Sequence, residues 1–321
     1  MNRTLAAILI GFCIDCLLGD PHSLPHPVVL IGKLITALET RLRAYFPKNA
    51  DGERKAGAVL WVITAGASFL VPLILLLALQ RVSYWLALIV ECIMCWQIFA
   101  AKSLMDESMK VFRALKNGDL IEARRAVSMI VGRDTEELDE AGVVRAAIET
   151  VAENTSDGVI APLFYMMIGG APLGFFYKAV NTMDSMLGYI DPPYTYIGYV
   201  PARADDVLNY IPSRLSALFM LAAGKLLRLD VSNGVRIWKR DRRRHTSPNS
   251  AQTESACAGL LGVELGGTST YRGVTHRKPC IGTPIRPVRA EDIPLTCSLM
   301  YTATLLALIL FSVIRWRILP V

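Results

Sequence analysis

The stretch "AIETVAENTSDGVIAPLFYMMIGGAPLGFFY", Ala147 to Tyr177, joins an acidic helix-forming segment to an uncharged one. Its second part, Gly158 to Tyr177, is uncharged for 20 residues, which is the length of a membrane-spanning helix. Pro162, Pro172 and the Gly169-Gly170 pair interrupt it, and a continuous helix does not tolerate all of these. We therefore predict a broken or re-entrant helix, because irregular backbone at membrane depth persists only when protein buries it or when it lines a wet cavity.

The composition places this stretch in a membrane protein. The chain has 321 residues, of which 53% are hydrophobic and 19% are charged, and this balance is too apolar for an ordinary soluble domain. Uncharged or nearly uncharged runs long enough to cross a bilayer recur along the chain. We interpret the first run, at the N-terminus, as an uncleaved helix rather than a signal peptide. The predicted spans are 4–19, 56–79, 82–101 and 295–314.

Lysine and arginine are concentrated in the segments 20–55, 102–157 and most of 178–294, which the positive-inside bias assigns to the cytoplasm. Segment 102–157 has helical periodicity, whereas segment 229–294 is rich in glycine and proline and reads as loop-rich. Because segments 102–157 and 229–294 lie on one side, the chain must cross the membrane an even number of times between them. We therefore predict that 158–177 and 212–228 are two helices that are either both re-entrant or both spanning. The fold class is an all-α integral membrane protein, a single polytopic domain with four to six membrane helices.

Charge and cysteine content exclude some functions. A net charge of +6 suits a membrane surface or anionic substrates, while the absence of a long basic or aromatic-interleaved stretch argues against nucleic acid. The two C-x-x-C pairs lie in apolar helices, where cysteine behaves as a small hydrophobic residue. They do not predict a metal or redox site.

The acidic part of the opening stretch is the first candidate site. Read as a helix, it places Glu149, Glu153 and Asp157 on one face, with Asn154 beside it, because side chains four residues apart stack along a helix. A solvated helix side is the alternative reading. Like charges beside a membrane-depth segment repel one another and favour a bound cation.

Three further clusters carry polar side chains at suggestive spacing. Adjacent aspartates between arginines are a common device for hard cations, although a surface loop explains them equally well. A glycine pair in the basic run 239–273 can present backbone N–H groups to phosphate, whereas the arginines of that run can instead hold lipid headgroups. The clusters comprise Lys178, Asn181 and Asp184; Arg203, Asp205, Asp206, Asn209 and Arg214; and Asn249, Gly266 and Gly267.

Five strings then show a family resemblance that covers most of the chain. They are "GDPHSLPHPVVLIGK", "VGRDTEELDEAGVVRAAIETVAENTSDGVIAPLFY", "GGAPLGFFYKAVNTMDSMLGY", "ADDVLNYIPSRLSAL" and "SPNSAQTESACAGLLGVELGG". Together they resemble the CobD/CbiB family of cobalamin biosynthesis proteins, the adenosylcobinamide-phosphate synthases.

The resemblance implies a multi-pass enzyme of the bacterial cytoplasmic membrane with its active site on the cytoplasmic face. Such an enzyme joins the propionate of adenosylcobyric acid to 1-amino-2-propanol or its O-phosphate, with ATP as co-substrate and Mg²⁺ as cofactor. Membrane lipid and other cobalamin-assembly enzymes are the remaining candidate partners. Since a carboxylate is a poor acylating agent, we expect an acyl phosphate intermediate.

This chemistry needs a metal site, phosphate-binding groups and a base, and the clusters supply each type. The expected metal ligands are Asp184, Asp205 and Asp206. The expected catalytic residues are Glu149, Glu153, Asp157 and Asn154. The expected substrate- or phosphate-binding residues are Lys178, Asn181, Arg203, Asn209, Arg214, Asn249, Gly266, Gly267 and His26.

Two other classes of protein remain open at this point. Broken helices with polar groups also occur in membrane transporters. A non-catalytic scaffold or sensor of corrinoid metabolism is the third reading. The few predicted spans, the absence of inverted repeats and the position of the polar clusters on one side argue against the transporter.

Overall fold

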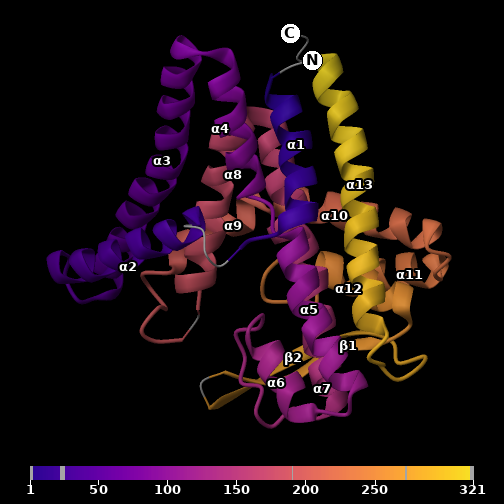
Figure 1. Cartoon of the computed structure of the whole chain (residues 1–321). Coiled ribbons are helices and arrows are strands. Elements are labelled where there is room, and N and C mark those ends of the chain that lie inside the picture. Colours follow the sequence, from indigo (N-terminus) through magenta and orange to yellow (C-terminus); the bar gives the residue numbers. More distant parts are fainter. Residues whose placement is uncertain (1–2, 22–25, 190, 272, 319–321) are drawn as a thin grey trace. The chain divides into compact units, whose positions relative to one another are not determined.

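The computed structural model describes residues 3–21, 26–189, 191–271 and 273–318. The described chain is predominantly helical, as predicted, with a single two-stranded hairpin (Figure 1). It folds into two compact units. Unit 1 consists of Met1–Ala100, Ala161–Asn209 and Phe311–Val321, and unit 2 consists of Ala101–Ile160 and Tyr210–Leu310.

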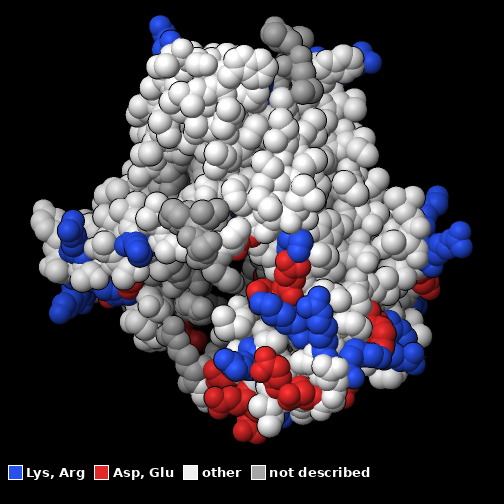
Figure 2. Space-filling view, viewed as in Figure 1, with Lys and Arg blue, Asp and Glu red and all other residues white. Residues whose placement is uncertain are grey.

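Unit 1 holds the most apolar helices. Over α3 and α4 the surface is almost bare of charged side chains between the helix ends (Figure 2). A core of aliphatic side chains from α2, α3 and α8 packs around Ile35, Leu60 and Met183. The helices of this unit are α1 (Arg3–Leu18), α2 (Pro27–Tyr45), α3 (Ala50–Val82), α4 (Tyr84–Trp96), α8 (Ala161–Leu187) and α9 (Tyr199–Leu208), with the end of α13 (Asp292–Ile318).

Four helical runs in the described residues are long and apolar enough to cross a membrane. They are Ala50–Val82, Tyr84–Lys116, Glu140–Leu187 and Asp292–Ile318.

The third of these runs is not straight, because α8 reverses direction within unit 1. Gly169 and Gly170 have non-helical backbone angles. The rings of Tyr165 and Tyr177 lie on opposite sides of this break and stack with their centroids 5.0 Å apart. Twelve residues of straight helix would separate them by about 18 Å. The predicted break is therefore confirmed, and α8 is a helical hairpin with its tip at the glycine pair.

Charged side chains surround the tip of this hairpin. Arg315 of α13 donates hydrogen bonds to the carbonyl oxygens of Met167 and Ile168, which the break removes from the helical pattern. Glu91, the one charge in the predicted span 82–101, forms an ion pair with Arg3 of α1 at 2.8 Å. These contacts satisfy backbone and carboxylate groups that would otherwise be costly to bury.

We expect Gly170→Ala to destabilise the protein by about 1–3 kcal/mol. Gly170 has φ +69° and ψ −165°, a conformation that is nearly restricted to glycine. A Cβ atom there would also lie 3.0 Å from both Glu91 Oε1 and Thr4 Cγ2. Thermal unfolding of the purified protein in detergent measures the effect. Gly66→Ala in α3 is the matched control, because no atom lies within 4 Å of its added Cβ. Equal unfolding temperatures for the two variants would contradict the expectation.

Unit 2 is built around α12, in which every residue after the first, Ser250, is buried. α7, α10, α11 and both strands pack against this helix. Most of its residues are small, so neighbouring elements approach closely. The elements of this unit are α5 (Ala101–Lys116), α6 (Leu120–Ser128), α7 (Glu140–Asn154), a π-helix η1 (Thr155–Ile160), α10 (Tyr210–Leu226), α11 (Val231–Asp241), α12 (Ser250–Leu261), β1 (Glu264–Tyr271) and β2 (Val274–Gly282), with the first part of α13.

The segment predicted to be loop-rich, 229–294, thus contains two helices and an antiparallel hairpin. In α12, sequence periodicity fails for a physical reason. A helix that is buried on every side and made of small residues has no polar face, so it shows no 3.6-residue alternation.

Candidate active site

Glu149 of α7 is at the centre of a buried group of charged side chains in unit 2. Only 6% of the residue is exposed. One carboxylate oxygen, Oε2, pairs with the Arg133 guanidinium, and the other, Oε1, accepts the backbone N–H of Gly266 at 2.7 Å. Arg133 also donates to Ser269 Oγ at 3.1 Å. One carboxylate therefore joins α7, the loop before it and strand β1.

Two more titratable groups face this carboxylate from other elements. Burial raises the pKa of Glu254 in α12 well above 4.5, and the charges of Glu153 and Glu149 raise it further, whereas Lys278 and Arg133 lower it. Burial also lowers the pKa of His245, against the opposing effect of Glu153. What we call the buried acid–base cluster consists of two buried residues, Glu149 and Glu254, and four partly buried ones, Arg133, Glu153, His245 and Lys278.

A tight turn fixes His245. Its Nδ1 accepts the backbone N–H of Ser247 at 3.1 Å, so Nε2 carries the proton of the neutral ring. The same turn continues to Asn249, a predicted substrate residue, which is 3% exposed. Asn249 Oδ1 accepts from Arg214 at 3.1 Å and from Ser213 at 3.2 Å. Two predicted binding residues, Arg214 and Asn249, thus lie in contact in unit 2.

The predicted acidic face changes its geometry after Asn154. The α-helical spacing holds through Glu149 and Glu153, but Asp157 lies in the π-helix, where each turn contains an additional residue. Asn154 donates its side-chain N–H to the Thr150 carbonyl at 3.0 Å. Because π-helical turns occur frequently at functional sites, this segment adds to the case for a site here.

Gly266 and Gly267 form an irregular step in β1. Their φ angles are +82° and +90°, and the strand register shifts between Leu265 and Gly267. The N–H of Gly266, which was predicted to face phosphate, is donated to Glu149. The space beside Gly267 is open, since an added Cβ would have no atom within 4 Å.

Unit 1 brings together a second set of predicted residues. The Asn181 side-chain amide lies 3.5 Å from Asp205 Oδ1, and Asp205 is 6% exposed. Asn209, which caps α9 and is 1% exposed, donates its backbone N–H to the Asp205 carbonyl at 2.8 Å. Tyr165 of the α8 hairpin donates to the Leu208 carbonyl at 2.8 Å, so the hairpin and α9 are tied together at this place.

The other predicted residues of unit 1 occupy more ordinary positions. Asp206 pairs with the largely exposed Arg203 at 3.4 Å, one turn away on the same helix. His26 caps α2 by accepting the Val28 N–H at 3.3 Å. Lys178 and Asp184 lie half-buried on the second arm of the hairpin.

Within the described residues, no group of three or more His, Cys, Asp or Glu side chains is placed to hold a metal ion. Asp184, Asp205 and Asp206 therefore do not form a cage. Mg²⁺ usually binds through one or two carboxylates together with water and substrate phosphate. The oxygen donors at Asp205 fit that mode of binding.

Sequence reasoning did not select four members of the buried acid–base cluster: Arg133, His245, Glu254 and Lys278. A signal for Glu254 is present, because it is the one charge in the otherwise uncharged run Ser247–Val263. A carboxylate inside such a run is expected to have a partner or a function.

These features define a helical integral membrane protein with a buried acid–base cluster. Comparison with known proteins identifies its family. A family model described as CobD/Cbib protein matches residues 8–300. The "Cobalamin biosynthesis protein CobD" of Clostridium tetani is 43% identical over 308 residues, which cover 96% of each chain. The "Cobalamin biosynthesis protein CbiB" of Salmonella typhi is 45% identical over 312 residues, which cover 97% of this chain and 98% of the relative. No solved structure matches.

The chain belongs to the CobD/Cbib family and has a role in cobalamin biosynthesis.

Proposed function

We propose that the chain is the ATP- and Mg²⁺-dependent ligase that forms the amide between adenosylcobyric acid and (R)-1-amino-2-propanol or its O-phosphate. The observation that carries this proposal, together with family membership, is the buried acid–base cluster of unit 2. Burial strengthens electrostatic interactions and keeps water from a reactive acyl group.

The reaction has two balanced steps. A propionate oxygen attacks the γ-phosphorus of ATP, the bond to the β-phosphate breaks, and ADP leaves. The amine nitrogen then attacks the acyl carbon, a base takes one proton from nitrogen, and inorganic phosphate leaves. Mg²⁺ would offset charge on the transferring phosphoryl group. Within unit 1, Asp205 with Asn181 are the residues proposed to bind Mg²⁺.

The base must accept a proton from an amine near neutral pH. An ordinary carboxylate is a weak base there, whereas one whose pKa is raised toward the working pH is more effective. Glu254 has this property because of its burial and its two carboxylate neighbours. We assign proton acceptance to Glu254 and Glu153, and charge stabilisation to Lys278 and Arg133. Asn154 and Asp157 are proposed to orient substrate.

Turnover by the detergent-purified protein tests the function. With adenosylcobyric acid, aminopropanol phosphate, ATP and Mg²⁺, we expect a corrinoid product whose mass shows condensation with loss of water. Omission of ATP should abolish it. If folded protein binds adenosylcobyric acid but forms no product, the ligase proposal is wrong. Uptake of corrinoid into proteoliposomes would then favour the transporter, and its absence the scaffold or sensor.

Asp205→Asn tests the proposed metal residue in the same assay. We expect the Mg²⁺ concentration for half-maximal turnover to rise at least about tenfold, because an amide oxygen is a weaker ligand than a carboxylate. Asp51→Asn is the control in the same unit, since Asp51 is in an exposed ion pair of little consequence. An unchanged Mg²⁺ requirement in Asp205→Asn would remove Asp205 from the metal site.

A further inference from the structure

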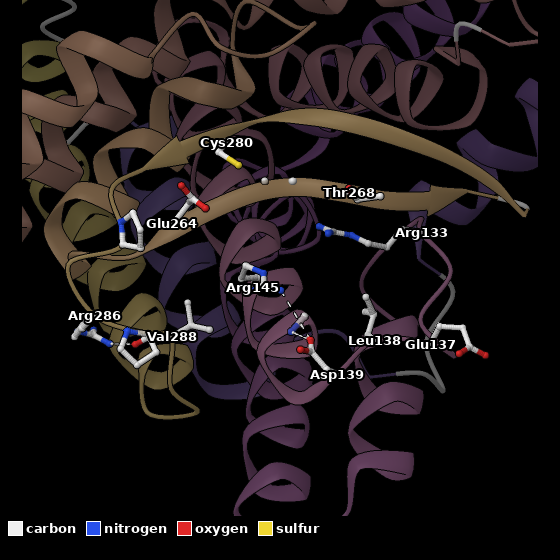
Figure 3. Close-up of a pocket in the computed structure, with 15 residues that line it drawn as sticks. Arg133, Glu137, Leu138, Asp139, Arg145, Glu264, Thr268, Cys280, Arg286 and Val288 are labelled. Atoms are coloured by element: carbon white, nitrogen blue, oxygen red, sulfur yellow. Dashed lines mark hydrogen bonds and ion pairs between the residues drawn. The ribbon is translucent and has the colours of Figure 1, made fainter.

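A cavity of about 680 Å³ lies entirely within unit 2, next to the buried acid–base cluster (Figure 3). Its walls are the loop 133–139, the first turns of α7, the irregular step of β1 and the loop 284–288. Arg133 and Gly266 line it, and both contact Glu149. A ligand in this cavity would therefore lie beside Arg133, a member of the cluster, and one residue away from Glu149.

Three guanidinium groups line the cavity, and they are held to different degrees. Arg133 pairs with Glu149, and Arg286 pairs with Asp292 through contacts of 2.5 and 2.9 Å. Arg145 is different: it lies 3.9 Å from Asp139 Oδ1, and that carboxylate oxygen already accepts the Gly142 N–H at 2.7 Å. Arg145 is thus the cation best able to exchange its contact for a ligand.

Carboxylates line the same cavity. Glu264 lines it from β1 and Arg145 lines it from α7 (Figure 3). Glu137 and Asp139 lie along its edge, so cationic and anionic groups are equal in number. A polyanion would meet repulsion from the carboxylates. A small ligand that carries both an anionic and a cationic group would find a partner for each.

The backbone step in β1 leaves room for such a ligand. Gly267 lines the cavity without a side chain, and the space beside its Cα is open. The ligand can approach the strand there, close to Gly266 and its contact with Glu149.

We propose that this cavity binds the phosphorylated amino alcohol, with its phosphate at Arg145 and its ammonium group at Glu264. The inference rests on the proposed function and selects the O-phosphate over free aminopropanol. Arg145 acts through bidentate, charge-assisted hydrogen bonds, which a phosphate can accept and a hydroxyl cannot match.

Steady-state kinetics with Arg145→Ala and Arg145→Lys test the proposal. Loss of charge-assisted hydrogen bonds predicts a KM for aminopropanol phosphate at least about tenfold higher in Arg145→Ala. The KM values for ATP and adenosylcobyric acid should stay within about twofold, and Arg145→Lys should recover part of the loss. Titration calorimetry with aminopropanol phosphate alone gives a second measure that does not depend on turnover.

Arg125→Ala is the matched control, because Arg125 is an exposed arginine of unit 2 outside this cavity. If the KM for ATP rises instead, the cavity is a nucleotide site and the proposal is overturned. It is equally overturned if free aminopropanol is used as well as its phosphate by the unaltered protein. Absence of any product from folded protein would instead count against the proposed function itself.

Discussion

Replacing Glu254 by glutamine is expected to lower the turnover number about 10²- to 10⁴-fold, the usual contribution of a general base. Glutamine has nearly the same volume and can be buried in α12, but it cannot accept the amine proton. The KM values should change little, because Glu254 is not assigned to substrate binding. Single-turnover measurement of amide formation at saturating ATP checks the result.

The pH dependence separates this role from a structural one. The carboxylate form of Glu254 is the active base, so turnover should fall as pH drops through its raised pKa, and Glu254→Gln should lack this limb. Stability should respond in the opposite direction. Because the unfolded chain releases this proton near 4.5 and the folded chain releases it only at higher pH, the free energy of unfolding should fall as pH rises between the two. Glu254→Gln should remove that slope.

Glu122→Gln is the control for both measurements. Glu122 is an exposed glutamate of unit 2, and its ion pair at 3.8 Å is expected to contribute little. Wild-type turnover in Glu254→Gln would transfer the role of base to Glu153.

The hairpin of α8 was predictable because its signals are local. A long uncharged run gives the membrane segment, and the Gly169-Gly170 pair with Pro172 marks the break. These residues act through their own backbone conformations, so no distant contact is needed to interpret them. The long apolar helices α3 and α13 were predictable for the same reason, because each contains an uncharged run of 20 or more residues.

The candidate site was only partly predictable, since it depends on contacts between distant segments. The spacing of Glu149 and Glu153 is visible in one helix, but Arg133 and Gly266 reach Glu149 from segments 16 and 117 residues away. The isolated charge of Glu254 is visible in the sequence, but its burial and its carboxylate neighbours appear only in the folded chain. The glycine pair was predicted to present its backbone N–H groups to phosphate. The N–H of Gly266 is instead donated to the carboxylate of Glu149.

The Arg133–Glu149 pair should produce the largest effect on stability. Glu149→Leu would leave a guanidinium that is 10% exposed without its carboxylate, and the Gly266 N–H without its acceptor. Breaking a buried pair from one side typically costs about 3–5 kcal/mol. We therefore expect little folded protein, or an unfolding temperature far below that of the wild type, by size-exclusion chromatography and thermal unfolding in detergent.

Removing both charges distinguishes this explanation from a simple packing defect. In Arg133→Met with Glu149→Leu no charge is left buried, so the double variant should be more stable than Glu149→Leu alone. Glu149→Gln should be intermediate, because its amide oxygen can still accept from Gly266. If the two single changes add in the double variant, the pair is not coupled, and Glu149 is then free to act on substrate rather than to hold α7 against β1. Because Arg133 also lines the cavity assigned to the amino alcohol phosphate, coupling would mean that ligand binding and the stability of this strand depend on the same ion pair.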